Sequence, residues 1–244
     1  MKKFGLMLLC VLGLMLLASC STELPDGWDQ AEVNKEDENN PEYQPEMPSY
    51  GHYLYFIGAT DGWANADQKL ETLNDDGVYT GYVYCADPNG WGNEFKFQLI
   101  AGNWDYQFNS QNLSSITGDF ARGDDNIKAI AGVGVYYVVL NVMDKSLKGK
   151  RINNVNLSGE FNGWDPGDNS QKLTWNANDY CFEISDARVT SGGWKFTTNG
   201  TWDINLGGTI GKLVADGDNL TVVGTTIKLY PTRKISGNIY CTVK

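Results

Sequence analysis

From residue 51 onward the chain is a series of short runs rich in β-branched and aromatic residues, separated by turns that contain glycine. Such runs occur at residues 135–140 (VYYVVL), 226–230 (TIKLY) and 239–243 (IYCTV), and they are typical of β-strands. No stretch of useful length has the apolar period of an amphipathic helix. Residues 120–130 are interrupted by glycine and aspartate. The pattern predicts an all-β fold.

Two segments of this globular part repeat one another. Residues 55–63 read YFIGATDGW, and residues 155–164 read VNLSGEFNGW. Each consists of a short predicted strand, a glycine and, four to five residues later, a Gly-Trp pair. The segments therefore mark the starts of two related units.

Four further landmarks recur in the same order. They are Gly77-Val78-Tyr79 and Asn178-Asp179-Tyr180, Glu94-Phe95-Lys96-Phe97 and Gly193-Trp194-Lys195-Phe196, Gly102-Asn103-Trp104-Asp105 and Gly200-Thr201-Trp202-Asp203, and Gly123-Asp124-Asp125-Asn126-Ile127 and Asp216-Gly217-Asp218-Asn219-Leu220. The first tryptophan precedes the lysine by 33 and 31 residues, and the lysine precedes the second tryptophan by 8 and 7. We predict two tandem immunoglobulin-like or carbohydrate-binding-module-like β-sandwiches, at residues 51–151 and 152–244.

Residues 1–20, MKKFGLMLLCVLGLMLLASC, contain two lysines, an apolar run and small residues before Cys20. This order predicts a secretion signal, which is too short and wrongly flanked for a transmembrane helix. Residues 17–20 (Leu-Ala-Ser-Cys) resemble a bacterial lipobox. The resemblance implies that Cys20 carries lipid, which would hold the protein at a membrane without spanning it. An ordinary secretory signal with an incidental Cys20 is the alternative.

Residues 21–50 contain four prolines, nine acidic residues and one basic residue, hence a net charge of −8 out of −11 for the whole chain. This composition cannot form a core. Like charges and prolines extend a linker. We therefore predict a disordered acidic tether that holds the globular part away from the membrane.

Charge and histidine content narrow the function. With 30 acidic and 19 basic residues, the chain lacks the surplus of lysine and arginine that neutralises phosphates, which excludes nucleic acid as a partner. The single histidine, His52, excludes catalytic dyads with an imidazole base and sites with several histidines on a metal. We expect no enzyme activity and no cofactor.

Three cysteines lie in the globular part: Cys85, Cys181 and Cys241. At most one disulfide can form among them, and a bridge between Cys181 and Cys241 is one interpretation. Buried free thiols in strands are the other. The acidic loops 165–169 and 216–219 offer oxygen ligands, but neither has the spacing of an EF-hand loop, so no metal site is predicted.

Tryptophans next to glycines in predicted turns call for an explanation, because a large ring in a turn is at best half-buried. The less polar face of a sugar ring stacks on an indole, while lysine and asparagine side chains can bond its hydroxyls. The candidate glycan-binding residues are Trp164, Lys195, Trp202 and Asn219 in the second module and Trp63, Lys96, Trp104 and Asn126 in the first. Trp91, in an Asn-Gly-Trp-Gly run without a counterpart, is a further candidate for an exposed ring in an inserted loop.

Each candidate also has a purely structural interpretation. The first tryptophan of each module can cap the core, and the second can pack in its turn. The lysines, which alternate with apolar neighbours and so point away from the core, can simply be solvated. The side chains of the asparagines can form hydrogen bonds with the backbone of their turns.

The residues of the second module resemble a known family. Residues 159–164 (GEFNGW), together with Trp194-Lys195-Phe196, the turn with Trp202 and the later Asn219, resemble the glycogen- and starch-binding modules of branching enzymes and of the AMP-activated kinase beta subunit. The resemblance implies an α-glucan site formed by Trp164, Lys195, Trp202 and Asn219. The first module departs from the motif, because Thr60-Asp61 stands in place of Phe-Asn.

The whole chain, with its lipobox and tandem modules, resembles the SusE and SusF outer-membrane starch-binding lipoproteins of Bacteroidota. Residues 21–26 also resemble the surface-export signals of such lipoproteins. The likeness covers residues 51–244. It departs from the family pattern in that an acidic tether stands in place of a separate N-terminal immunoglobulin-like domain. It implies a non-catalytic protein, anchored in the outer membrane through Cys20 and facing the cell exterior, that holds starch-like polysaccharide for an uptake complex of the SusC/SusD type.

Two other functions remain open at this point. A glycoside hydrolase would need two carboxylates at a suitable separation, yet the repeated landmarks are aromatic. A structural or partner-binding surface lipoprotein would use the same tryptophans as anchors in a protein interface. Burial of Trp164 and Trp202 would favour this second alternative, and their exposure on a common face would favour sugar.

Overall fold

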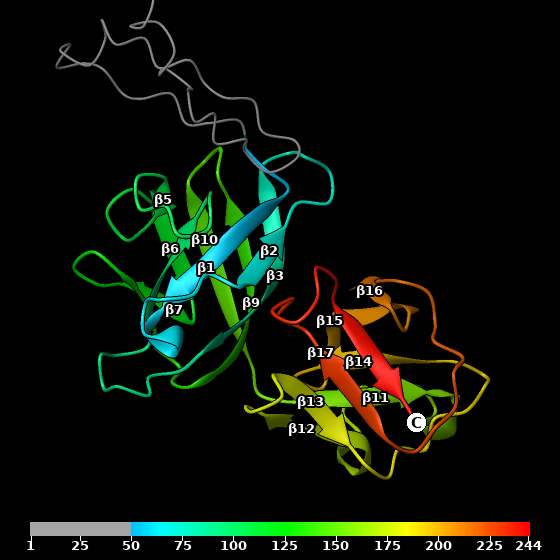
Figure 1. Ribbon diagram of the computed structural model, residues 1–244. Helices are drawn as coiled ribbons and strands as arrows, with labels where there is room; N and C mark the ends of the chain where they lie inside the picture. Colours follow the sequence, from blue (N-terminus) through cyan, green and yellow to red (C-terminus); the bar gives the residue numbers. More distant parts are fainter. Residues whose placement is uncertain (1–49) are drawn as a thin grey trace, which may run out of the picture. The chain divides into compact units, whose positions relative to one another are not determined.

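The computed structural model of the protein describes residues 50–244 (Figure 1). The predicted signal, the tether up to residue 49 and Cys20 lie outside the described residues. Strands form nearly all of the regular structure in the described part, and its only helices are three single 3₁₀ turns: η1 (Ala59–Asp61), η2 (Glu160–Asn162) and η3 (Asn169–Gln171). The prediction of an all-β fold is confirmed.

Ten strands from the first half of the described chain form one sheet. They are β1 (Tyr53–Gly58), β2 (Gln68–Glu71), β3 (Val78–Cys85), β4 (Glu94–Gln98), β5 (Gln107–Phe108), β6 (Ser115–Gly118), β7 (Phe120–Arg122), β8 (Ile127–Ala129), β9 (Gly134–Asn141) and β10 (Ser146–Ile152). Their order is β6-β10-β9-β3-β2-β1-β4-β8-β7, with β5 paired to β4. Only Asp119 separates the two end strands β6 and β7 along the chain. The sheet therefore curls until its ends meet, and it encloses a core.

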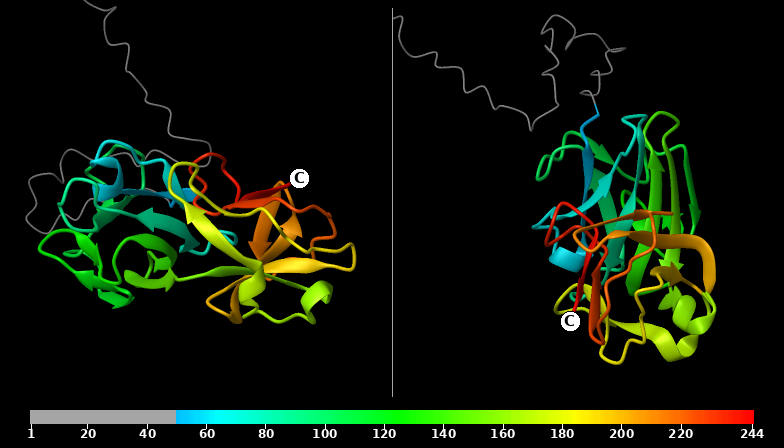
Figure 2. Two further views of the ribbon diagram at one scale, coloured as in Figure 1. Left: turned by 90° about the horizontal axis from the view of Figure 1, so that it is seen from below. Right: turned by 90° about the vertical axis from the view of Figure 1, so that its right-hand side faces the viewer.

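Eight strands from the second half form the other sheet. They are β11 (Val155–Gly159), β12 (Lys172–Asn176), β13 (Cys181–Ile184), β14 (Trp194–Thr198), β15 (Thr201–Thr209), β16 (Lys212–Ala215), β17 (Ile227–Tyr230) and β18 (Tyr240–Val243). Their order is β16-β15-β14-β11-β12-β13-β17-β18. Leu213 of β16 bridges to Ile239, next to β18, so this sheet also folds back on itself. The left view of Figure 2 shows the strands of the two sheets as separate groups.

The sequence repeat corresponds to a repeat of strand pairing. In the first sheet β1 lies antiparallel between β2 and β4, and in the second β11 lies antiparallel between β12 and β14. A 3₁₀ turn follows the central strand in both cases. The landmarks of the two modules therefore occupy equivalent places in their sheets.

Aromatic side chains fill both cores. In the first module Phe95 packs against Phe56 and Phe120, with ring centroids 5.2 and 4.9 Å apart. In the second, Trp194 is fully buried against Phe196. Its indole Nε1 donates to the Val222 carbonyl at 2.9 Å, so this tryptophan buries its polar atom with a partner and serves the core.

The loop between β17 and β18 makes ion pairs with residues of the first module. Arg233 donates to Glu71 at 2.6 Å, and both side chains are buried. Lys234 lies 3.5 Å from the Asp61 carboxylate and also pairs with Asp67. A Cβ at position 81 would lie 2.9 Å from Arg233 Nη1, which explains the glycine there.

All three cysteines of the described part are free and buried. Cys241 pairs in register with Leu229, and Leu229 pairs with Phe182. Since Cys181 adjoins Phe182 and neighbouring residues of a strand point to opposite faces, Cys181 and Cys241 lie on opposite faces of the sheet. The interpretation as a disulfide is therefore wrong, and the thiols are buried in strands.

Candidate functional site

The first tryptophan of each module follows its 3₁₀ turn in a left-handed backbone conformation. The φ angles are 62° and 61° at Gly62 and Trp63, and 65° and 63° at Gly163 and Trp164. The Trp63 amide donates to the Gly58 carbonyl at 3.0 Å, and the Trp164 amide donates to the Gly159 carbonyl at 2.8 Å. A bulky residue rarely adopts this conformation. The same strained turn therefore positions the indole in both modules.

The second tryptophan of each module lies beside the first. The ring centroids of Trp63 and Trp104 are 6.3 Å apart and their planes are inclined by 40°. The corresponding values for Trp164 and Trp202 are 6.2 Å and 41°. We call these the first pair and the second pair. Trp104 is 45% exposed and Trp202 is 38% exposed, so each pair offers aromatic surface to solvent.

The two lysines occupy equivalent ladder positions but differ in their partners. Lys96 of β4 lies opposite Ile57, and Lys195 of β14 lies opposite Ser158. Lys96 is only 7% exposed and forms an ion pair with Asp125, so the interpretation of this lysine as solvated is wrong. Lys195 is half-buried and has no hydrogen-bond or ion-pair partner within residues 50–244. Its ammonium is therefore available to a ligand.

The two asparagines show the same contrast. Asn126 donates its side-chain amide to Glu94 at 2.7 Å. Asn219 is exposed, and its side chain makes no hydrogen bond within the described part of the chain. A Cβ at Gly193 would lie 3.3 Å from Asn219 Nδ2, which places this amide at the start of the strand that carries Lys195.

Asp125 and Glu94 were not among the residues expected at the first site. Asp125 binds Lys96 and also accepts from Asn109 at 3.1 Å. The position of Asp125 directly before Asn126 could have indicated its role, because neighbouring residues of a turn often share hydrogen-bond partners. No local pattern in the sequence distinguishes Glu94, whose partner is 32 residues away.

The turn of the second module is closed by side chains. Asn162 accepts from the Gly159 amide at 2.9 Å and donates to the Leu157 carbonyl and the Asp168 carboxylate, each at 3.1 Å. Hydrogen bonds from Ser170 and Asn162 hold the pKa of Asp168 below its usual value. In the first module Asp61 stands in place of this asparagine, and burial raises its pKa against the opposing effect of Lys234.

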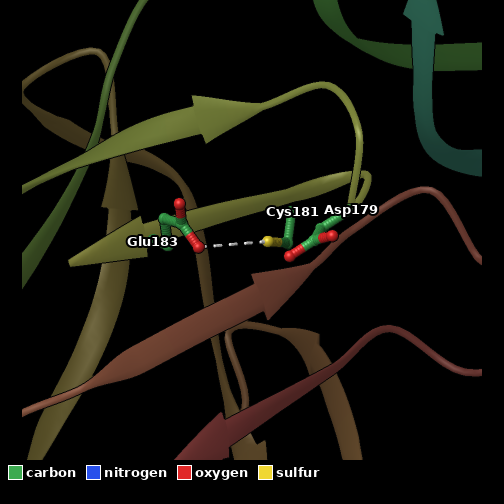
Figure 3. A group of neighbouring side chains, drawn as sticks. All are labelled: Asp179, Cys181 and Glu183. Atoms are coloured by element: carbon green, nitrogen blue, oxygen red, sulfur yellow. Dashed lines mark hydrogen bonds between the residues drawn. The ribbon is translucent and has the colours of Figure 1, made fainter. Parts of the chain in front are cut away.

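The only group of possible metal ligands in the described residues is Asp179, Cys181 and Glu183 (Figure 3). The ammonium of Lys228 lies 2.7 Å from Asp179 and 2.9 Å from Glu183. It already supplies the positive charge of the cluster, and these contacts raise the pKa of Lys228. Burial raises the pKa of the Cys181 thiol to about 11, which disfavours the thiolate that binds metals. The cluster is explained as an ion-pair network.

No protein-family model matches the chain, and no curated protein is significantly similar to it. Within residues 50–244 no helix has the length and apolarity needed to cross a membrane.

Proposed function

We propose that this protein is a non-catalytic glycan-binding lipoprotein whose two modules each hold a carbohydrate chain on a tryptophan pair. The two pairs support this proposal, because their centroid separations and ring inclinations agree to within 0.1 Å and 1° between the modules. An exposed indole about 6 Å from a half-buried one suits the stacking of sugar rings. A core-capping role would not require strained turns that leave part of the rings in water.

We propose a starch-like α-glucan as the ligand. Planes inclined by 40° and 41° suit a chain that bends between successive sugars, whereas a flat, extended chain matches rings that share one plane. The inclination therefore supports the α-glucan that the sequence resemblance implies over a cellulose-like β-glucan.

The second module is proposed as the stronger site. Lys195 and Asn219 have unused donors within the described residues, and an ammonium and an amide can bond sugar hydroxyls. The corresponding donors of the first module already serve Asp125 and Glu94. A sugar could use these two donors only by displacing Asp125 from Lys96 and Glu94 from Asn126. The first pair is therefore proposed to bind mainly by stacking.

The place of action is proposed from the sequence. Lipid on Cys20 would anchor the protein in the outer membrane, and the acidic tether would present the modules at the cell exterior. Two modules on one tether raise the avidity for a polymer with many equivalent sites. The proposed role is to hold polysaccharide near a SusC/SusD-type uptake complex.

Retention of the purified protein on insoluble starch tests the proposal. We expect retention, a loss of roughly 30-fold in affinity for Trp202→Ala or Trp164→Ala because each indole is a central contact, and a smaller loss for Trp63→Ala or Trp104→Ala. Trp28→Ala, outside the described residues, is the control matched in residue type. Cellulose provides the control for glycan type.

The same experiment addresses the two alternatives. No retention of the parent protein, or retention that all four substitutions leave intact, would contradict the proposal and favour a partner-binding role for the tryptophans. Release of reducing sugar from starch by the purified protein would favour a hydrolase.

A further inference from the structure

The loop between β3 and β4, residues 86–93, carries the most exposed tryptophan of the described chain, Trp91, at 54%. Gly90 and Gly92 on either side of it have φ angles of 73° and 83°, in the left-handed region that favours glycine. Both oxygens of the Asp87 carboxylate accept backbone amides: Oδ1 from Trp91 at 2.6 Å and Oδ2 from Gly92 at 2.8 Å. The loop is thus held in one conformation that presents the indole to solvent.

This loop is attached to the turn that carries the first pair. The Ala86 amide donates to Thr60 Oγ1 at 2.8 Å, and the Thr60 hydroxyl lies within hydrogen-bond distance of the carbonyls of Tyr84 and Ala86. A Cβ at Gly62 would lie 3.8 Å from the side-chain amide of Asn89. Gly62, next to Trp63, and Asn89, two residues before Trp91, are therefore neighbours in space.

The second module has no equivalent ring. Residues 185–193, between β13 and β14, contain no aromatic side chain, and Glu160 of η2 lies where a side chain at Gly192 would need to be. Thr60 stands where the second module has Phe161. Its hydroxyl forms the hydrogen bonds that attach the β3–β4 loop to the turn. The difference between the motifs therefore coincides with the gain of the inserted tryptophan.

We propose that Trp91 extends the first pair by a third aromatic contact, which stacks on a further sugar of the same glycan chain. The proposal rests on the proposed function and adds to it a difference in ligand length. The first module recognises a longer stretch of polysaccharide through three rings, and the second recognises a short stretch through two rings and free polar donors. The rigid loop keeps the entropic cost of this contact low.

Binding of maltotriose and maltoheptaose by the full chain, measured by calorimetry in a Trp202→Ala background, reports mainly on the first module, because the second has lost a central contact. We expect the added substitution Trp91→Ala to weaken maltoheptaose binding by about tenfold, the loss of one stacking contact, and to leave maltotriose binding unchanged. Asp87→Ala, which releases the loop, should weaken maltoheptaose binding to a lesser degree. Met143→Ala, an exposed residue outside the site, is the control.

Equal affinity of Trp91→Ala and its parent for both sugars would overturn the inference, and so would an equal loss for both. Absence of binding in the Trp202→Ala background, with binding in the unmodified protein, would overturn it by showing that the first module is inactive. Absence of α-glucan binding in the unmodified protein would instead contradict the proposed function itself. Because Trp91 is exposed, its substitution is expected to leave the midpoint of thermal unfolding unchanged.

Discussion

At the scale of the residue, Trp63 and Trp164 hold φ angles of 61° and 63° that bulky side chains rarely adopt. Such strain costs roughly 1–2 kcal/mol for a residue with a Cβ, and glycine would avoid it. A sequence selected only for stability would not need an indole at this point in both modules. The strain at both tryptophans supports the proposal that their rings contact a ligand.

Substitution of Trp164 by glycine and by alanine separates strain from function. Both variants lose the indole and its packing, but only alanine keeps a Cβ in the left-handed region. We expect Trp164→Gly to be more stable than Trp164→Ala by about 1 kcal/mol in urea unfolding, while both lose roughly 30-fold in affinity for starch. Greater stability of the alanine variant would show that the turn relaxes when the indole is removed.

At the scale of the element, the turn from η2 to η3 is closed by Asn162 and Asp168. The equivalent turn of the first module is attached instead through Thr60 to the β3–β4 loop and through Asp61 to Lys234. The same backbone path is therefore held by different side chains in the two modules. This difference accounts for Thr60-Asp61 in the first module where the second has Phe161-Asn162.

The bond between Asn162 and Asp168 predicts a dependence on pH. Because the pKa of Asp168 is lower in the folded protein, its contribution to stability is full above the usual aspartate pKa and is lost as pH falls through the folded value. We expect Asp168→Asn to lower the free energy of unfolding at neutral pH by no more than about 1 kcal/mol, since solvent screens the carboxylate. Urea unfolding of both proteins should show the difference vanish at low pH. A constant difference at all pH values would contradict this assignment.

At the scale of the whole molecule, the described residues form one compact unit, although their strands form two sheets. The core of the second module includes Tyr82, Val135 and Ile152 from strands of the first sheet. The buried pair of Glu71 and Arg233 joins residues 162 positions apart. Burial lowers the pKa of Arg233 against the opposing effect of Glu71. The two modules are therefore expected to unfold together.

Removal of one member of this buried pair should be costly. Arg233→Ala leaves the buried Glu71 carboxylate with its hydrogen bond to His52 but without the guanidinium, and we expect a loss of about 3 kcal/mol in the free energy of unfolding. Addition of Glu71→Gln should recover part of the loss, because it removes the unpaired charge. Urea unfolding followed by circular dichroism measures both. A loss below about 1 kcal/mol for Arg233→Ala would indicate that the pair is open to water.

Period-two patterns and the repeated Gly-Trp turns were sufficient to predict an all-β fold and to pair Trp164 with Trp202 and Trp63 with Trp104. Equal spacing along two related segments of the chain places equivalent residues at equivalent points of a sheet. The pairing of the tryptophans could therefore be inferred from the sequence. The spacing did not distinguish Lys96 from Lys195, because the partner of Lys96 is 29 residues away.

Local periodicity and repetition in the sequence suffice to predict the strand-rich character of the protein, its two repeated segments and the candidate residues. The folded chain was needed to see that the donors of Lys96 and Asn126 are occupied, that Cys181 and Cys241 lie on opposite faces of a sheet, and that the Trp91 loop lies against the turn of Trp63. Each of these depends on which distant strands are neighbours. Strand order is set by the packing of a whole core, and no short segment of sequence encodes it.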